Sequence, residues 1–227
     1  MSTYRRYAIY WLPEGALARW GEAWLGWDMA KGAALPRLVL PGLPGALEAL
    51  TRSATTYGCH ATIKPPFHLE DGYDASEVSE TLAAFCAAEP AVVTEALALD
   101  SIDGFLALTI KGDKSAVDAL AARALMAFDR FRAPAPPDEF ARRRAANLSP
   151  RQEGHLARWG YPYVMEDFRF HVTLTDRLLP DASAQVADVI GPQIADLLPR
   201  PFVIGGLSLV GQTTTGFRTI AHHAFTG

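Results

Sequence analysis

A long internal repeat constrains the fold of this chain more than any other feature. The tripeptide His-x-Thr occurs at His60 and again at His171. The next predicted strand opens 32 residues after the first histidine, at Val92, and 31 residues after the second, at Phe202. A Gly-Phe pair follows the two histidines at distances of 44 and 45 residues. Both units are therefore predicted to fold as strand, helix, strand, turn and strand.

Two such units predict an α+β fold with two pseudo-symmetric lobes, each an antiparallel sheet backed by helices. We expect one bilobal domain over residues 1–227, with the His60 motif in one half, the His171 motif in the other and a helical insertion at about 138–160. If a pseudo-twofold axis relates the lobes, the two sheets form a central cleft with helices outside, and the two histidine rows face one another across it.

Hydrophobic periodicity and turn residues supply the element boundaries. Strands are expected at 4–12, 60–64, 91–99, 105–110, 170–175, 202–210 and 217–225. Helices are expected at 14–25, 45–52, 76–88, 114–131, 138–146, 149–159 and 182–198. For the helix at 149–159, Ser149 is a natural N-cap and Pro150 suits the first helical position.

The first His-x-Thr strand is predicted to carry a polar row. Alternate side chains of a strand share one face, so His60, Thr62 and Lys64 should lie together. Pro65 and the proline after it are expected to end the strand. An imidazole, a hydroxyl and an ammonium in one row indicate an anion site that contains a titrating group.

The second His-x-Thr strand repeats this row with His171, Thr173 and Thr175 on one face. A single His-x-Thr is weak evidence, and two structural histidines remain an alternative reading. The shared strand context and the matched downstream spacing favour a paired functional site.

Composition limits the classes of function. The net charge of −4 argues against a general polyanion binder and against long nucleic acid as a partner. Cys59 and Cys86 are too few for a disulfide framework, which favours a reducing compartment. No stretch has the roughly 18 apolar residues of a membrane span. We expect a cytoplasmic protein without a membrane partner.

Four segments carry a resemblance to a known family. They read YGCHATIKPPF, FDRFRAPAPPDEFARRR, LSPRQEGHLARWGYPYV and FRFHVTLTD. Together they resemble the 2H phosphoesterase superfamily, and more narrowly its branch associated with phosphonate-utilisation operons. The resemblance implies a LigT-like bilobal fold and a metal-independent phosphodiesterase. Members of the branch usually have Phe where Cys59 stands, on the face away from His60.

The motif residues of the family carry over as His60, Thr62, His171 and Thr173. One histidine would act as general base toward water and the other as general acid toward the leaving alkoxide. The threonine hydroxyls would bind the phosphoryl oxygens. The sequence leaves open which histidine is the base, and the scheme requires no metal and no cofactor.

Four further residues are candidates for substrate binding: Lys64, Tyr57, Arg218 and Arg143, the last within an arginine cluster. Each could equally be a surface or packing residue. No HExxH or cysteine-rich spacing indicates a zinc site.

The sequence supports a hydrolase of a small cyclic phosphodiester, such as a 2′,3′-cyclic nucleotide or a ribose cyclic phosphate, with a role in phosphonate breakdown. The expected partner is then a small phosphorylated substrate. An RNA-end cyclic phosphodiesterase or 2′-5′ ligase-like enzyme is an alternative. A phosphate-ligand binding protein without turnover and a metal-dependent hydrolase are the remaining alternatives.

Overall fold

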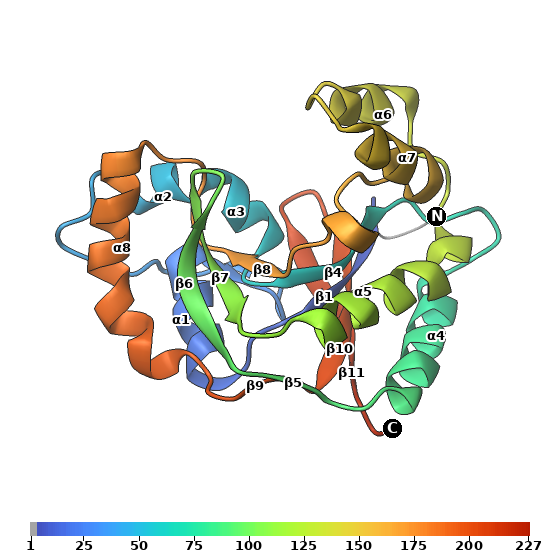
Figure 1. Cartoon of the computed structure of the whole chain (residues 1–227), viewed down its shortest axis with the longest axis horizontal. Helices are drawn as coiled ribbons and strands as arrows, with labels where there is room; N and C mark the ends of the chain where they lie inside the picture. The colour runs from blue at the N-terminus through green and yellow to red at the C-terminus, as the bar shows by residue number, and fades with distance from the viewer. Residues whose placement is uncertain (1–3) are drawn as a thin grey trace.

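A seven-stranded antiparallel sheet forms the centre of the molecule, in the order β11-β10-β1-β4-β8-β7-β6 (Figure 1). The computed structural model describes residues 4–227. The strands of this sheet are β1 (Tyr7–Trp11), β4 (Ala61–Phe67), β6 (Ala96–Ile102), β7 (Phe105–Lys111), β8 (His171–Thr173), β10 (Gly206–Gln212) and β11 (Phe217–Ala224). Two small antiparallel sheets pair β2 (Trp27–Asp28) with β3 (Ala33–Ala34) and β5 (Val92–Thr94) with β9 (Phe202–Ile204). The predicted α+β class with antiparallel sheets is confirmed.

Eight α-helices and three short 3₁₀ turns are found among residues 4–227. The helices are α1 (Gly15–Leu25), α2 (Leu47–Leu50), α3 (Arg52–Tyr57), α4 (Ala75–Ala88), α5 (Ser115–Ala127), α6 (Pro137–Arg144), α7 (Pro150–Trp159) and α8 (Pro180–Ile194). The 3₁₀ turns are η1 (Asp129–Phe131), η2 (Met165–Asp167) and η3 (Ala195–Leu197). Figure 1 shows α3 and the α6–α7 pair above strands β4 and β8, with α4 and α5 below them.

Each repeated unit contains one β-hairpin, and each hairpin lies on the side of the sheet that holds the His-x-Thr strand of the other unit. The hairpin β6–β7, which follows β4 in the chain, pairs with β8, whereas the hairpin β10–β11, which follows β8, joins β4 through β1. Helix α4 accordingly packs on β10 and β11, and α8 packs on β6 and β7. Each side of the sheet therefore combines strands from both units, and the β4–β8 pair joins the two sides into one continuous sheet.

Two apolar clusters occupy the two faces of the sheet. The larger one contains Ile9, Ile63 and Val172, together with the buried faces of α1, α4, α5 and α8. The smaller one, on the other face, contains Tyr10, Trp27, Met29, Val210 and Phe217. Because neighbouring residues of a regular strand point to opposite faces, the residues on either side of Ala61 in β4 and of Val172 in β8 point away from the large core.

Strand β4 does not end at Pro65. It continues to Phe67, which pairs with Tyr7, and its register against β1 shifts on both sides of Ile9. Proline lacks the N–H that a regular ladder needs, and strands accommodate it at bulges. The expectation that the prolines end the strand was wrong because these irregularities let the strand pass through them.

The helical segment at 138–160 contains α6 and α7. Helix α7 begins with a capping box: the hydroxyl of Ser149 accepts from the backbone N–H of Gln152, whose side chain accepts from the N–H of Ser149. The predicted N-cap and the proline at the first helical position are confirmed. Among residues 4–227, no helix is both long enough and apolar enough to cross a membrane.

Candidate active site

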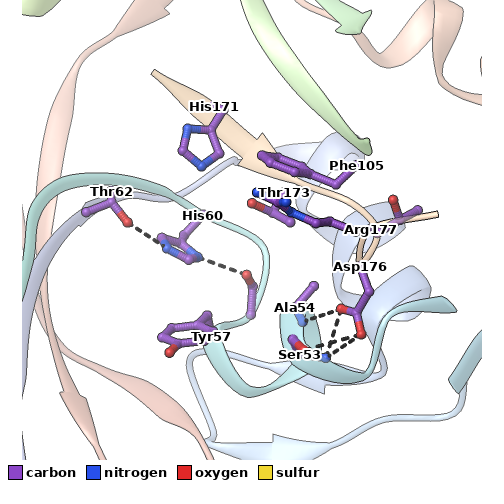
Figure 2. A pocket seen from close by; sticks show the side chains of 12 residues that line it. Ser53, Ala54, Tyr57, His60, Thr62, Phe105, His171, Thr173, Asp176 and Arg177 are labelled. Atoms are coloured by element: carbon purple, nitrogen blue, oxygen red, sulfur yellow. Dashed lines mark hydrogen bonds between the residues drawn. The ribbon is translucent and has the colours of Figure 1, made fainter. Parts of the chain in front are cut away.

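A pocket of about 340 Å³ lies where β4 and β8 pair, and both His-x-Thr motifs line it (Figure 2). The strands run antiparallel with Ala61 opposite Val172, and these two small apolar side chains face the core. The residues before and after them point to the other face. This register sets each histidine across from the threonine of the other motif. The lining residues are Ser53, Ala54, Tyr57, Gly58, His60, Thr62, Phe105, His171, Thr173, Thr175, Asp176 and Arg177.

The backbone of Gly58 fixes the ring of His60. Gly58 ends α3 with φ +73°, and its carbonyl oxygen lies 2.9 Å from Nδ1 of His60. A carbonyl only accepts, so Nδ1 carries the proton and Nε2 has the free lone pair. The hydroxyl of Thr62, 3.0 Å from Nε2, donates to that lone pair. His60 is thus held as a neutral imidazole whose basic nitrogen faces the pocket.

Burial keeps His60 neutral. The ring is 8% exposed and stacks on Tyr10, with ring centroids 3.7 Å apart and an interplanar angle of 21°. The pKa of His60 is lowered to about 4, mainly by desolvation; the Gly58 carbonyl opposes this shift and the nearby imidazole of His171 adds to it. A neutral imidazole with a free nitrogen is the form that a general base needs.

His171 is held in the same way but is less enclosed. Its Nδ1 donates to the carbonyl oxygen of Arg169 at 2.8 Å, which leaves Nε2 for a ligand. Phe105 lies beside the ring, with centroids 5.7 Å apart. Burial lowers the pKa of His171 from its usual value. Both motifs therefore fix their imidazoles through backbone carbonyls at Nδ1 and leave Nε2 as the nitrogen that a ligand can reach.

The threonines divide into two kinds. Thr62 and Thr173 line the pocket with partly exposed side chains. Thr175 is 1% exposed, and its hydroxyl accepts from the backbone N–H of Leu106 at 2.9 Å. The first two can reach a ligand, whereas Thr175 ties the end of β8 to β7.

The sequence analysis missed Arg177 and Asp176. Arg177 is exposed, lines the pocket and forms no ion pair or hydrogen bond with the rest of the described chain. Extending the alternation of His171, Thr173 and Thr175 by one step would have identified it. The carboxylate of Asp176 accepts from the backbone N–H groups of Ser53 (2.9 Å) and Ala54 (3.3 Å) and so fastens the start of α3 to the end of β8.

Of the four further candidates for substrate binding, Tyr57 lies in the pocket, with its ring centroid 6.3 Å from that of His60. Arg143 lies in an adjoining pocket that shares Tyr57 and Thr62 with the first. Arg218 is exposed, packs against Gly32 and lines neither pocket.

Lys64 lies on the opposite face from His60. The irregular register of β4 pairs Thr62 with Tyr10 but Lys64 with Ile9, so one extra residue of β4 turns Lys64 into the core. Its Nζ donates to the carbonyl oxygen of Leu125 at 3.3 Å and lies 3.8 Å from the carboxylate of Asp129. Burial lowers the pKa of this ammonium to about 8. The prediction that Lys64 shares a face with His60 was wrong because it assumed an uninterrupted strand.

Cys59 lies in the large core, 3% exposed, against Gly21 of α1. Burial raises the pKa of its thiol to about 12. Among residues 4–227 there is no group of three or more His, Cys, Asp or Glu side chains arranged to hold a metal ion.

A family model matches residues 62–218, which include Thr62 and the whole second motif. The family is described as a protein family of unknown function, DUF1045. The chain belongs to the DUF1045 family. The match covers well over half of the chain; it begins two residues after His60 and takes in most of both repeated units.

The chain is also similar to part of two longer curated proteins. The chain is 41% identical over 177 residues to a ribose 1,5-bisphosphate phosphokinase PhnN of Janthinobacterium sp. (strain Marseille), covering 77% of the chain and 39% of that protein. It is 38% identical to the PhnN of Laribacter hongkongensis (strain HLHK9), covering 76% of the chain and 40% of that protein. The chain thus spans about two fifths of the length of these relatives.

Solved structures similar to this DUF1045 chain include a phosphoesterase, at 16% identity and a TM-score of 0.41, with 99% of each chain covered. Another is E. coli LigT in complex with NADP⁺, at 16% identity and a TM-score of 0.43, also with 99% of each chain covered.

Proposed function

We propose that this DUF1045 protein is a metal-independent phosphodiesterase that opens a small cyclic phosphodiester, with His60 as general base and His171 as general acid. The observation that carries the proposal is the crosswise arrangement of two His-x-Thr motifs on paired strands, in which each Nδ1 is held by a backbone carbonyl. This geometry leaves two Nε2 atoms for one ligand, as a reaction with one proton removed and one proton delivered requires.

The two roles follow from the surroundings of the rings. With its pKa lowered to about 4, His60 is neutral near pH 7 and can take a proton from an attacking water. His171 is less enclosed, so an anionic substrate beside it stabilises its imidazolium form. His171 then gives its proton to the alkoxide oxygen that leaves phosphorus. Water adds to phosphorus, the P–O bond of the ring breaks, and the product is a phosphomonoester with a free hydroxyl.

Three side chains are suited to compensate the charge that builds on the phosphoryl oxygens. The hydroxyls of Thr62 and Thr173 would donate hydrogen bonds, and Thr62 would turn from Nε2 of His60 to a phosphoryl oxygen as substrate binds. The guanidinium of Arg177 is free of protein partners among the described residues and would provide the full positive charge.

A ribose cyclic phosphate is the substrate we favour. The curated relatives that contain this sequence as part of their length are named for an activity on ribose 1,5-bisphosphate. Two catalytic units on one chain benefit from a high effective concentration when the product of one resembles the substrate of the other. A phosphorylated ribose, with a role in phosphonate breakdown, satisfies that condition.

The test is turnover of a panel of cyclic phosphodiesters in the presence of EDTA. The panel contains ribose cyclic phosphates, 2′,3′-cyclic nucleotides and short RNAs with cyclic ends, assayed with wild type and with His60→Ala and His171→Ala. We expect chelator-resistant hydrolysis that each substitution lowers by about 10²- to 10⁴-fold. His223→Ala is the matched control, because this histidine is hydrogen-bonded to Ser79 outside the pocket.

Other outcomes of this assay would support one of the alternative functions. Preference for RNA ends would indicate an RNA-end phosphodiesterase, and loss of activity in EDTA would indicate a metal-dependent hydrolase. Binding of these ligands by well-folded wild type without turnover of any of them would indicate a binding protein and would overturn the proposal.

A further inference from the structure

A second pocket of about 260 Å³ adjoins the catalytic pocket and shares Tyr57 and Thr62 with it. We propose that this pocket binds a phosphomonoester, so that the preferred substrate is a small sugar with two phosphate groups: a cyclic phosphodiester between the histidines and a terminal phosphate here. The inference rests on the proposed function only for the cyclic phosphodiester, and the site for the terminal phosphate does not depend on it. The lining residues are Arg6, Tyr10, Tyr57, Thr62, Pro65, Pro66, Arg142, Arg143 and Tyr161.

The charge of the second pocket suits a dianion. Arg6, Arg142 and Arg143 line it, and Glu139 is the carboxylate that pairs with Arg6 and Arg143. Oε1 of Glu139 lies 2.5 Å from Nη2 of Arg143 and 3.6 Å from Nη1 of Arg6. Arg142 forms no ion pair or hydrogen bond within residues 4–227. Three guanidinium groups against one carboxylate leave an excess of positive charge, and a phosphomonoester carries about −1.5 to −2 at neutral pH.

Two buried donors in the lining lack acceptors. Nε of Arg143 and the hydroxyl of Tyr10 are both buried and have no hydrogen-bond partner among the described residues. A buried donor without an acceptor is costly, and each such group calls for an explanation. Terminal phosphate oxygens are strong acceptors, so a phosphate in this pocket would supply the acceptors that the protein does not.

Two of the arginines, Arg6 and Arg143, are held in place before a ligand arrives. Nε of Arg6 donates to the side-chain oxygen of Gln212 at 2.8 Å, and the guanidinium of Arg143 lies 4.8 Å from the ring centroid of Tyr161. Glu139 is itself held by His68, whose Nε2 lies 3.0 Å from Oε2. Fixed donors lose little conformational entropy on binding and favour bidentate contacts to phosphate.

The two pockets meet at Thr62, whose hydroxyl also contacts His60. A ligand that occupies both would therefore extend from between the histidines, past Thr62, to the arginines. Helix α6, which carries Arg142 and Arg143, is thereby assigned a role in choosing the substrate.

The test compares a ribose cyclic phosphate with and without a phosphate on its O5. Wild type is expected to show a higher kcat/KM for the phosphorylated compound. Arg142→Ala, an exposed position, should lower the ratio of the two kcat/KM values by about 10- to 100-fold, mainly through KM. Tyr10→Phe keeps the stack on His60 and should lower the same ratio by a smaller factor. Arg144→Ala, whose side chain pairs with Glu153 outside both pockets, should leave the ratio unchanged.

Binding of ribose 5-phosphate, measured by calorimetry, separates this inference from the proposed function. Weaker binding by Arg142→Ala than by wild type supports the second pocket even if no cyclic phosphodiester is hydrolysed. If Arg142→Ala and Arg144→Ala give the same ratio of activities and the same affinity for ribose 5-phosphate as wild type, the inference is wrong.

Discussion

The two His-x-Thr motifs are alike in sequence, in the carbonyl that holds each ring and in their place on paired strands, yet their surroundings differ. His60 lies beneath Tyr10, with its Nε2 hydrogen-bonded by Thr62, and burial lowers its pKa to about 4. His171 lies at a more open position beside Phe105, with Nε2 unbonded among the described residues. The difference teaches that packing can give one tripeptide two proton affinities, and hence two roles.

The largest expected effect tests that division of roles through the leaving group. A p-nitrophenyl phosphodiester expels a stable phenolate and needs no general acid. His171→Ala should therefore lose about 10²- to 10⁴-fold in kcat on a cyclic phosphodiester but much less on the p-nitrophenyl substrate. His60→Ala should lose activity on both. Steady-state kinetics measure this, with folding checked by circular dichroism.

The opposite pattern, in which only His60→Ala is rescued by the better leaving group, would exchange the two roles. If both variants lost the same activity on both substrates, the two motifs would be equivalent in spite of their surroundings.

The two threonines are expected to differ in a second way. Thr62→Val and Thr173→Val should each lower kcat/KM by about 10²-fold, because each removes one donor to the phosphoryl oxygens. Thr62→Val also removes the hydrogen bond that stabilises neutral His60, so the pKa of that ring should rise. Rates measured across pH would show this rise in Thr62→Val alone, and an equal shift in Thr173→Val would contradict it.

The pH dependence of kcat/KM should be bell-shaped. His60 acts as base only when deprotonated, so activity should fall about tenfold per unit as pH drops below about 4. His171 acts as acid only when protonated, and burial lowers its pKa, so activity should fall as pH rises through a value below 6.5. Tyr10→Leu uncovers His60 and should move the acidic limb upward, whereas Tyr10→Phe, which keeps the ring, should not.

An acidic limb near 6.5 in wild type would show that burial does not control His60. The limb at higher pH, which we assign to His171, would then show whether the two histidines still have different pKa values.

The smallest expected effect is on stability, at Gly58 and Arg169, whose backbone carbonyls hold the two imidazole rings. A methyl group on Gly58 would clash with Sδ of Met29, and φ at this position is +73°. Gly58→Ala should lower the free energy of unfolding by about 1–3 kcal/mol and disturb His60. Arg169, the counterpart beside His171, has an exposed side chain, so Arg169→Ala should change stability by less than about 0.5 kcal/mol. Chemical denaturation measures both, and equal stability of the two variants would contradict the comparison.

Much of the site could be predicted from local patterns. The alternation of β4 and β8 brought Thr62 and Thr173 to the same face as the histidines, and the same rule extends to Arg177. The rule failed at Lys64, because one extra residue of β4 at the pairing with Ile9 turns the Lys64 side chain to the other face. A bulge depends on how two strands pair, and no pattern within 60–67 announces it.

The exchange of hairpins between the two repeated units was likewise outside the reach of sequence periodicity. Periodicity predicts which segments are strands, and it does not say which strands pair. The β7–β8 pair, together with the pairing of β1 with both β4 and β10, decides that topology, and these strands are far apart in the chain.

By itself, the sequence determined the repeat, the strand faces and the two motifs, because these follow from residue order and backbone geometry over a few residues. Only the tertiary structure decided which histidine is more deeply buried, that Lys64 belongs to the core, and that the arginines of α6 join Arg6 beside the candidate active site. The physical reason is that desolvation and strand pairing depend on atoms distant in sequence: Tyr10 lowers the exposure of His60, and Ile9 sets the face of Lys64.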